Sequence, residues 1–295
     1  MGKIFCMGDI HGFYGAFYER LDQLGNLHTV LDAGARDRLI LLGDYIDGGP
    51  DSRKVLCLIR SLQIASPEHV IVLRGNHEEM LLDWLDTYAG LHAGEPDEDG
   101  LIPWNNWLDT DPDFQTFRSL VSQDQWDSFR KALPSMSETA ANMEAARMVL
   151  AANRELISWL RGLPYYYETP TQIFVHAGVD EEAGEDWKWG ISEEMLLNQY
   201  PAQTGKFCKD VIAGHIATST ISGRRDFHDI LWDGESHYYC DGSVAVSGEI
   251  PVLVYDEADG AYYSLGADPA PECRDRDSRR QIRGELRPVE KMDFR

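Results

Sequence analysis

The stretch KIFCMGDIHG, residues 3–12, decides the fold class of this 295-residue chain. Its first five residues form a short apolar run that is typical of a buried strand. Asp9 and His11 follow directly, where that strand would end, and residues 13–24 then place apolar side chains at helical spacing. The stretch therefore predicts a strand, a loop that carries chemically active side chains, and a helix.

The same strand, loop and helix pattern recurs twice. Residues 38–42 and 69–73 are apolar runs, and the polar loops GDYID at 43–47 and RGNH at 74–77 follow them. The next helices are expected from the capping residues Asp51 or Ser52 to Leu62, and over 78–88. Alternation of this kind predicts a layered α/β fold whose polar loops gather at the carboxyl ends of the strands.

The alternation stops between residues 89 and 164, where the clearest signal is a long helix over about 137–160. We expect a mainly helical insertion or cap there, packed through Trp104, Trp107 and Trp126. Strand-like runs then return and indicate a second sheet, which would make a β-sandwich flanked by helices. These runs cover 173–175, 211–213, 238–240 and 251–255. The expected organisation is one domain over residues 1–267 and a charged C-terminal tail over 268–295.

Composition restricts the classes of partner. The chain has 27 Lys and Arg against 50 Asp and Glu, a formal charge of −23, which opposes binding to nucleic-acid backbones and anionic membranes. Its five scattered cysteines form no CxxC pair, so neither a disulfide framework nor a zinc knuckle is indicated. The N-terminus leaves no room for a signal peptide, and no apolar run approaches the length of a membrane span. We therefore expect a cytoplasmic protein without nucleic-acid or membrane partners.

Five separated loops present Asp, His or Asn directly after an apolar run. The residues are Asp9 and His11, Asp44 and Asp47, Asn76 and His77, His176, and His215. Each piece alone is a weak signal, because such residues are common in turns. Together, carboxylates and imidazoles suit divalent metals such as Mn, Fe or Zn, and one carboxylate can bridge two ions. The ordered set predicts a two-metal site that activates water.

The motifs as a set resemble those of a known family. The strings GDIHG at 8–12, GDYIDGG at 43–49, RGNHE at 74–78, HAG at 176–178 and GH at 214–215 are similar to those of metallophosphoesterases of the phosphoprotein phosphatase type. The match spans residues about 3 to 256 and implies a calcineurin-like β-sandwich with flanking helices. Bacterial serine/threonine protein phosphatases and diadenosine tetraphosphate hydrolases share these motifs, so the resemblance specifies the superfamily better than the substrate.

The resemblance implies a set of metal ligands. Asp9 and His11 would hold a first divalent ion, and Asp44 would bridge both ions, which would share the attacking hydroxide. The second ion would be held by Asn76, His176 and His215. Manganese is the expected metal, with Fe, Zn and Ni as alternatives.

The resemblance also implies the residues that act on the substrate. His77, oriented by Asp47, would protonate the leaving oxygen, a transfer typically worth ~10²–10⁴-fold in rate. Arg74 would bind the phosphate with Asn76, since a planar guanidinium matches two phosphate oxygens. Two alternatives stay open: His77 could be a metal ligand or support one, and Arg74 could form an ion pair with Glu78 or Glu79.

The chain departs from the family at its arginines. Gly48 stands where the protein phosphatases usually carry Arg, and residues 180–213 lack the further arginine of the family. Lys188 is the best substitute in that segment, although an exposed lysine is as good an interpretation. Arg53, Arg224 or Arg225 could instead reach the site from elsewhere. Fewer guanidinium contacts predict a high KM on simple monoesters.

Three functions are compatible with these residues. The leading hypothesis is hydrolysis of phosphoserine or phosphothreonine in proteins, and the alternative is hydrolysis of dinucleoside polyphosphates or another small phosphorylated metabolite. A weakly catalytic phosphate-binding module is a third hypothesis, suggested by Gly48 and the missing arginine. The presence of His77 and Asp47 opposes it, because a binding module has no use for a leaving-group acid. The histidines without motif neighbours, His237 among them, are expected to be ordinary structural or surface residues.

Overall fold

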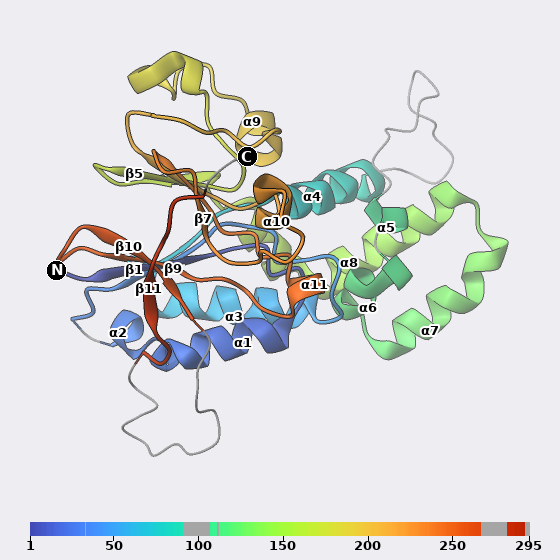
Figure 1. Ribbon diagram of the computed structural model, residues 1–295. Coiled ribbons are helices and arrows are strands. Elements are labelled where there is room, and N and C mark those ends of the chain that lie inside the picture. Colours follow the sequence, from blue (N-terminus) through green and yellow to red (C-terminus); the bar gives the residue numbers. More distant parts are fainter. Residues whose placement is uncertain (33, 91–106, 111, 267–281, 293–295) are drawn as a thin grey trace.

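A computed structural model of the chain describes residues 1–32, 34–90, 107–110, 112–266 and 282–292. Two β-sheets pack against each other, and helices lie on their outer sides (Figure 1). The first sheet has the strand order β11 (Leu286–Pro288), β10 (Ala261–Leu265), β9 (Leu253–Asp256), β1 (Lys3–Met7), β2 (Arg38–Leu41) and β3 (Val70–Val72). The second has the order β4 (Tyr166–Glu168), β5 (Gln172–Val175), β6 (Asp210–Ala213), β8 (His237–Tyr239) and β7 (Leu231–Trp232). The expected β-sandwich flanked by helices is confirmed.

Parallel strands form the centre of both sheets. In the first sheet β1, β2 and β3 run parallel, with Phe5 opposite Leu39 and Leu39 opposite Val70. In the second sheet β5, β6 and β8 run parallel, and the remaining strands pair antiparallel at the edges or beside β1. The carboxyl ends of parallel strands lie at one edge of a sheet, so the loops that follow these strands meet there.

Alternating side chains of each central strand belong to different cores. In β1, Ile4 and Cys6 pack into the space between the sheets, while Phe5 and Met7 pack against the helices. Both sets are almost fully buried, and burial of one large apolar side chain contributes about 1.5–3 kcal/mol. Because the side-chain period of a strand is two, this pattern fixes the register of β1, and with it the positions of the residues that follow.

The helices of the first half lie close to their expected ranges. The expected helices are α1 (Tyr14–Gln23), α3 (Ser52–Ala65) and α4 (Asn76–Ala89), and the short helix α2 (His28–Leu31) was not predicted. Helix α4 starts two residues before the expected residue 78, so Asn76 and His77 belong to its first turn. The reason is a capping interaction, in which the Glu78 carboxylate accepts a hydrogen bond from the backbone N–H of Gly75 at 3.0 Å.

Helices separated by short connections make up most of the described part of the expected insertion. It contains α5 (Trp107–Thr110), α6 (Gln115–Leu120), α7 (Gln123–Ala132) and α8 (Glu138–Arg161). Trp107 and Trp126 are buried, as expected for packing residues, whereas Trp104 lies outside the described residues. Ser122 and Ser137 cap α7 and α8 with their hydroxyl groups.

Several elements near the C-terminus were not predicted. Strand β10 pairs with β9, and β11 adds an edge strand from within the segment expected to be a charged tail. Residues 267–281 and 293–295 lie outside the described residues. The second half also contains α9 (Glu193–Asn198), α10 (Thr218–Ser222) and α11 (Val244–Ser247). Among the described residues, none of the helices is long and apolar enough to cross a membrane.

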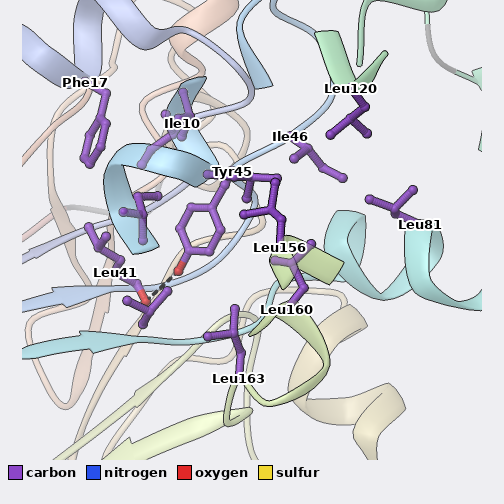
Figure 2. Packing of buried hydrophobic residues seen from close by; sticks show 14 of the residues in the cluster. Ile10, Phe17, Leu41, Tyr45, Ile46, Leu81, Leu120, Leu156, Leu160 and Leu163 are labelled. Atoms are coloured by element: carbon purple, nitrogen blue, oxygen red, sulfur yellow. Dashed lines mark hydrogen bonds between the residues drawn. The ribbon is translucent and has the colours of Figure 1, made fainter. Parts of the chain in front are cut away.

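The loop after β2 is anchored in the main core. Tyr45 is fully buried, and its hydroxyl donates to the carbonyl oxygens of Leu73 at 2.7 Å and Leu41 at 3.0 Å. Figure 2 shows the side chains of Ile46 and Tyr45 in one cluster with leucines of α4 and of the insertion. The labelled leucines of α4 and the insertion are Leu81, Leu120, Leu156, Leu160 and Leu163. The loop and the insertion therefore share a single core.

Candidate metal centre

The structure gathers the polar loops that follow five parallel strands. Asp9 and His11 follow β1, Asp44 follows β2, Asn76 follows β3, His176 follows β5 and His215 follows β6. Five residues of these loops have left-handed backbone conformations, which non-glycine residues rarely adopt. They are Asp9 (φ 52°), His11 (φ 47°), Asp44 (φ 56°), Asp47 (φ 68°) and His215 (φ 66°). Backbone strain of this kind persists where surrounding contacts enforce it, and it is often found at functional sites.

Asp44 lies at the centre of the cluster. Its Oδ2 atom is 3.7 Å from His11 Nε2 and 3.8 Å from His77 Nε2, and its Oδ1 atom is 3.4 Å from His176 Nε2. Two groups of potential ligand atoms share this carboxylate, namely His11, Asp44 and His77, and Asp44, His176 and His215. Burial would raise the pKa of Asp44, but the surrounding imidazoles lower it to about 2, so the carboxylate is ionised at neutral pH.

The Asn76 amide adjoins the second group. The Oδ1 position of its amide is 2.7 Å from His176 Nε2 and 3.1 Å from His215 Nδ1. His176 Nδ1–H donates to the carbonyl oxygen of Leu42 at 3.1 Å, which leaves the Nε2 lone pair directed into the cluster. Burial lowers the pKa of His176 to about 4, so this imidazole is neutral at pH 7 and able to bind a cation.

The first group contains His11 and adjoins Asp9. His11 Nδ1–H donates to the carbonyl oxygen of Ile46 at 3.1 Å, which again leaves Nε2 free to bind a cation. Asp9 is buried, and its Oδ1 atom accepts the backbone N–H of His215 at 3.0 Å. Its Oδ2 atom is buried without a hydrogen-bond partner in the described parts of the chain. Burial, with the charges of Asp241 and Asp44, raises the pKa of Asp9 well above its usual value.

The donor set fits divalent cations. Carboxylate oxygens and imidazole nitrogens converge without a lysine or arginine side chain in their recorded contacts, and the Asn76 amide lies against nitrogens of His176 and His215. A buried oxygen such as Asp9 Oδ2 is costly when it is unpaired, and a cation would remove that cost. Mixed oxygen and nitrogen donors suit Mn, Fe or Zn. Asp44, shared by the two groups, is placed to contact two ions.

His77 and Asp47 form a hydrogen-bonded pair beside these groups. His77 Nδ1 donates to Asp47 Oδ2 at 2.8 Å, and the His77 side chain is 30% exposed, so its other nitrogen can be reached from solvent. Burial would lower the pKa of His77, but Asp44 and Asp47 raise it to about 9. The imidazole is therefore protonated at neutral pH in the absence of cations, although its place in the first group also keeps the ligand role open.

The recorded partners of the Arg74 guanidinium lie outside the cluster. Its guanidinium donates to Glu79 Oε2 at 2.7 Å and to the Tyr165 hydroxyl at 3.0 Å. It also donates to the carbonyl oxygens of Leu160 at 3.2 Å and Arg161 at 2.6 Å, at the C-terminal end of α8. These contacts correspond to the ion-pair alternative, with Glu79 as the partner. Arg74 ties α4 to the insertion.

The basic side chains that could replace the missing family arginines have other partners. Lys188 pairs with Glu168 of β4 and lies over the Trp187 ring, 5.4 Å from its centroid. Arg53 Nε donates to Asn153 of α8 at 3.1 Å, and Arg224 lies over the ring of Phe227. Arg225 is exposed. None of these recorded contacts brings a guanidinium or ammonium group to the carboxylate and imidazole cluster.

Glu78 and Asp241 are two site residues that the motif analysis gave no role. The fully buried Glu78 carboxylate accepts backbone N–H groups of Asp44 at 2.9 Å, Tyr45 at 2.7 Å and Gly75 at 3.0 Å. It therefore joins two of the ligand loops, and burial followed by the Asp44 charge raises its pKa to about 7. Asp241 is buried and lies just after β8. It follows an apolar strand, as the predicted metal ligands do, so the same sequence pattern could have identified it.

Two glycines allow the loops to approach each other. A Cβ atom on Gly214 would lie 2.1 Å from Asp9 Oδ2, and one on Gly75 would lie 2.2 Å from Asp44 Oδ1. Both distances are shorter than any van der Waals contact, so a larger residue would displace the carboxylate. The glycines of the GH and RGNHE strings are therefore required by packing at the ligands.

Comparisons with known proteins agree with this geometry. A family model described as calcineurin-like phosphoesterase matches residues 2–229. A symmetrical bis(5'-nucleosyl)-tetraphosphatase from Delftia acidovorans is 37% identical over 112 residues, which cover 34% of this chain and 35% of that protein. A serine/threonine-protein phosphatase from Arabidopsis thaliana is 38% identical over 115 residues, or 36% of this chain and 11% of that protein. The aligned regions thus span about a third or less of these relatives.

A solved structure shares the fold over almost the whole chain. The crystal structure of a candidate diadenosine tetraphosphatase aligns with a TM-score of 0.50 and 16% identity, and it covers 90% of this chain and 93% of that chain. At this level of identity the alignment shows a common fold.

Proposed function

Because the chain belongs to the calcineurin-like phosphoesterase family, we propose that it is a metal-dependent enzyme that hydrolyses phosphate esters. The family match confirms the resemblance found in the motifs. The observation that carries the proposal is the position of Asp44, a buried carboxylate shared by two groups of imidazole ligands. One carboxylate between two cation sites is the arrangement that two-metal hydrolysis needs.

The side chains have distinct tasks in this proposal. Two divalent cations, when bound, would supply Lewis acidity and lower the pKa of a water molecule. His11 and Asp9 would hold one cation, Asn76, His176 and His215 the other, and Asp44 both. His77 would donate its Nε2 proton to the leaving oxygen while Asp47 accepts the Nδ1–H hydrogen bond and keeps the ring oriented.

Turnover of p-nitrophenyl phosphate tests the activity. We expect manganese-dependent hydrolysis by the wild type, complete inhibition by EDTA, and at least about a 100-fold lower kcat for Asp44→Asn. Glu155→Gln, at an exposed position on α8, is the matched control and should retain full activity. Equal turnover by Asp44→Asn and the wild type would reject the proposed site.

The substrate class is proposed from the relatives. A phosphoserine or phosphothreonine residue of a protein is the leading candidate, supported by the RGNHE string and the protein phosphatase relative. A dinucleoside polyphosphate is the second candidate, supported by the tetraphosphatase relative. Manganese as the native metal and a cytoplasmic location remain predictions, which metal analysis of the native protein and cell fractionation would test.

A comparison of catalytic efficiency distinguishes the two substrate classes. We would compare kcat/KM for a phosphothreonine peptide and for diadenosine tetraphosphate under the same metal conditions. A kcat/KM at least tenfold higher for the peptide would support a protein phosphatase. The reverse ratio would reject it in favour of the dinucleoside polyphosphate.

A further inference from the structure

Asp47 makes a contact that the roles above do not explain. Its Oδ2 atom accepts the His77 Nδ1–H at 2.8 Å and also the indole Nε1–H of Trp107 at 2.9 Å. Its other oxygen, Oδ1, is buried and has no partner among the described residues. The imidazole and the indole therefore share one oxygen, and together they define the orientation of the carboxylate.

Trp107 belongs to the insertion and not to the loops that carry the ligands. It is the first residue of α5, and its side chain is fully buried. Its ring packs on Trp84 of α4, with ring centroids 4.9 Å apart. Trp84 is fixed in turn, because its Nε1–H donates to Asn142 Oδ1 of α8 at 2.7 Å. The indole is thus held against the helix whose first turn carries His77.

A second insertion residue contacts the backbone of Asp47. Thr116 of α6 is fully buried, and its Oγ1 atom accepts the Asp47 N–H at 3.1 Å and lies 3.0 Å from Ser52 Oγ. Asp47 has a φ of 68°, a conformation that non-glycine residues keep only under constraint. The insertion therefore constrains Asp47 at the backbone through Thr116 and at the carboxylate through Trp107.

We propose that Trp107 is a positioning residue for the His77–Asp47 pair, so that the helical insertion completes the catalytic site. This inference rests on the proposed function, since it takes His77 as the leaving-group acid. A packing role alone would use the Trp107 ring and leave its N–H without consequence. A buried N–H donated to a carboxylate is a strong hydrogen bond, and it holds Oδ2 where His77 needs an acceptor.

The kinetic test compares two esters that differ in their need for an acid. p-Nitrophenolate leaves readily without a proton, whereas the more basic phenolate leaves with the help of His77. For Trp107→Phe we expect the kcat on phenyl phosphate to fall about tenfold more than the kcat on p-nitrophenyl phosphate. Trp159→Phe removes an indole N–H of α8 that donates to Gln63 Oε1 instead of Asp47, and it serves as the control, with equal effects on both esters.

Two kinetic outcomes would overturn the inference. One is an equal change on both esters for Trp107→Phe, and the other is the same selective loss for Trp159→Phe. No turnover of either ester by the wild-type protein would reject the proposed function, and with it the positioning role.

An NMR measurement tests the contact without relying on activity. In protein labelled with ¹⁵N-tryptophan, the Trp107 indole signal is assigned by its loss in Trp107→Phe. Asp47→Ala should shift that signal and accelerate its hydrogen exchange, while the Trp84 signal stays in place. An unchanged Trp107 signal in Asp47→Ala would show that the hydrogen bond is absent and would overturn the inference, whatever the turnover.

Discussion

At the scale of single residues, Arg74 has two possible roles that make opposite predictions. Its side chain is 9% exposed, and the guanidinium donates to Glu79, Tyr165 and two carbonyl oxygens of the insertion. Arg74→Lys keeps the charge but loses the planar fork, so we expect the free energy of unfolding to fall by about 2–3 kcal/mol. The KM for p-nitrophenyl phosphate should change less than about threefold.

Urea unfolding and steady-state kinetics of Arg74→Lys check this prediction. Arg60→Lys is the control, since Arg60 forms an exposed ion pair with Glu155 and should change stability by less than about 0.5 kcal/mol. A KM more than tenfold higher for Arg74→Lys, at unchanged stability, would instead assign Arg74 to the phosphate.

Gly214 gives a second prediction at this scale. The Cβ of Gly214→Ala would lie 2.1 Å from Asp9 Oδ2, so Asp9 must move. We expect manganese affinity to fall about 10–100-fold, as for the loss of other groups that orient metal ligands. Isothermal titration of the metal-free protein measures this. Gly15→Ala, in open space within α1, should bind manganese like the wild type, and equal affinities for all three proteins would contradict the packing argument.

At the scale of elements, His237 joins β8 to the segment that follows β5. Its Nε2–H donates to Glu181 at 2.6 Å and its Nδ1–H to Asp233 at 3.0 Å, and the ring is buried. Burial would lower the pKa of His237, but the two carboxylates raise it. The imidazolium therefore stabilises the folded state fully below the unfolded pKa of about 6.5, and this contribution is lost as pH rises through the folded pKa.

The pH dependence of unfolding tests the role of His237. We expect the stability difference between the wild type and His237→Gln to be largest near pH 6 and to shrink towards pH 9 or above. Urea unfolding at several pH values gives this difference. A difference that is constant or grows with pH would show that the ring is neutral in the folded protein.

The sequence predicted the helices and strands whose apolar residues recur with a clear spacing, and it missed the elements that depend on tertiary contacts. Strands β1 and β2 and helix α8 have clear apolar patterns and lie within a few residues of their expected ranges. Strand β11 has only three residues and is defined by its pairing with β10. Helix α4 begins early because the buried Glu78 carboxylate caps it, an interaction that depends on the neighbouring loop.

The residues of the candidate site also divide into those that local sequence patterns predict and those that depend on tertiary contacts. Residues such as Asp44 and His176 could be found because each follows an apolar strand, and parallel pairing then brings the strand ends together. The direction of Arg74 and the hydrogen bond of Trp107 could not be found, because both depend on where α8 and α5 pack. The string around Arg74 offers Glu79 as an ion-pair partner but contains no information about the carbonyl oxygens of α8 that the guanidinium also contacts.

At the scale of the whole molecule, the formal charge of −23 acts on every anionic substrate. Repulsion over distances beyond about 10 Å is screened at 0.1 M salt, whereas contacts inside the site are screened much less. We expect kcat/KM for p-nitrophenyl phosphate to rise as NaCl is increased from low concentration to 0.15 M. A matched series at fixed manganese measures it. A steady decrease would indicate a locally positive approach to the site.

The number of metal ions bound per chain tests the central claim, that Asp44 serves two cation sites. The protein would be purified without chelator, reconstituted with manganese, freed of excess metal and measured by elemental analysis alongside Asp44→Asn. The account predicts two ions per wild-type chain and fewer than one in the variant. One ion or none in the wild type, or two ions in both proteins, would contradict it.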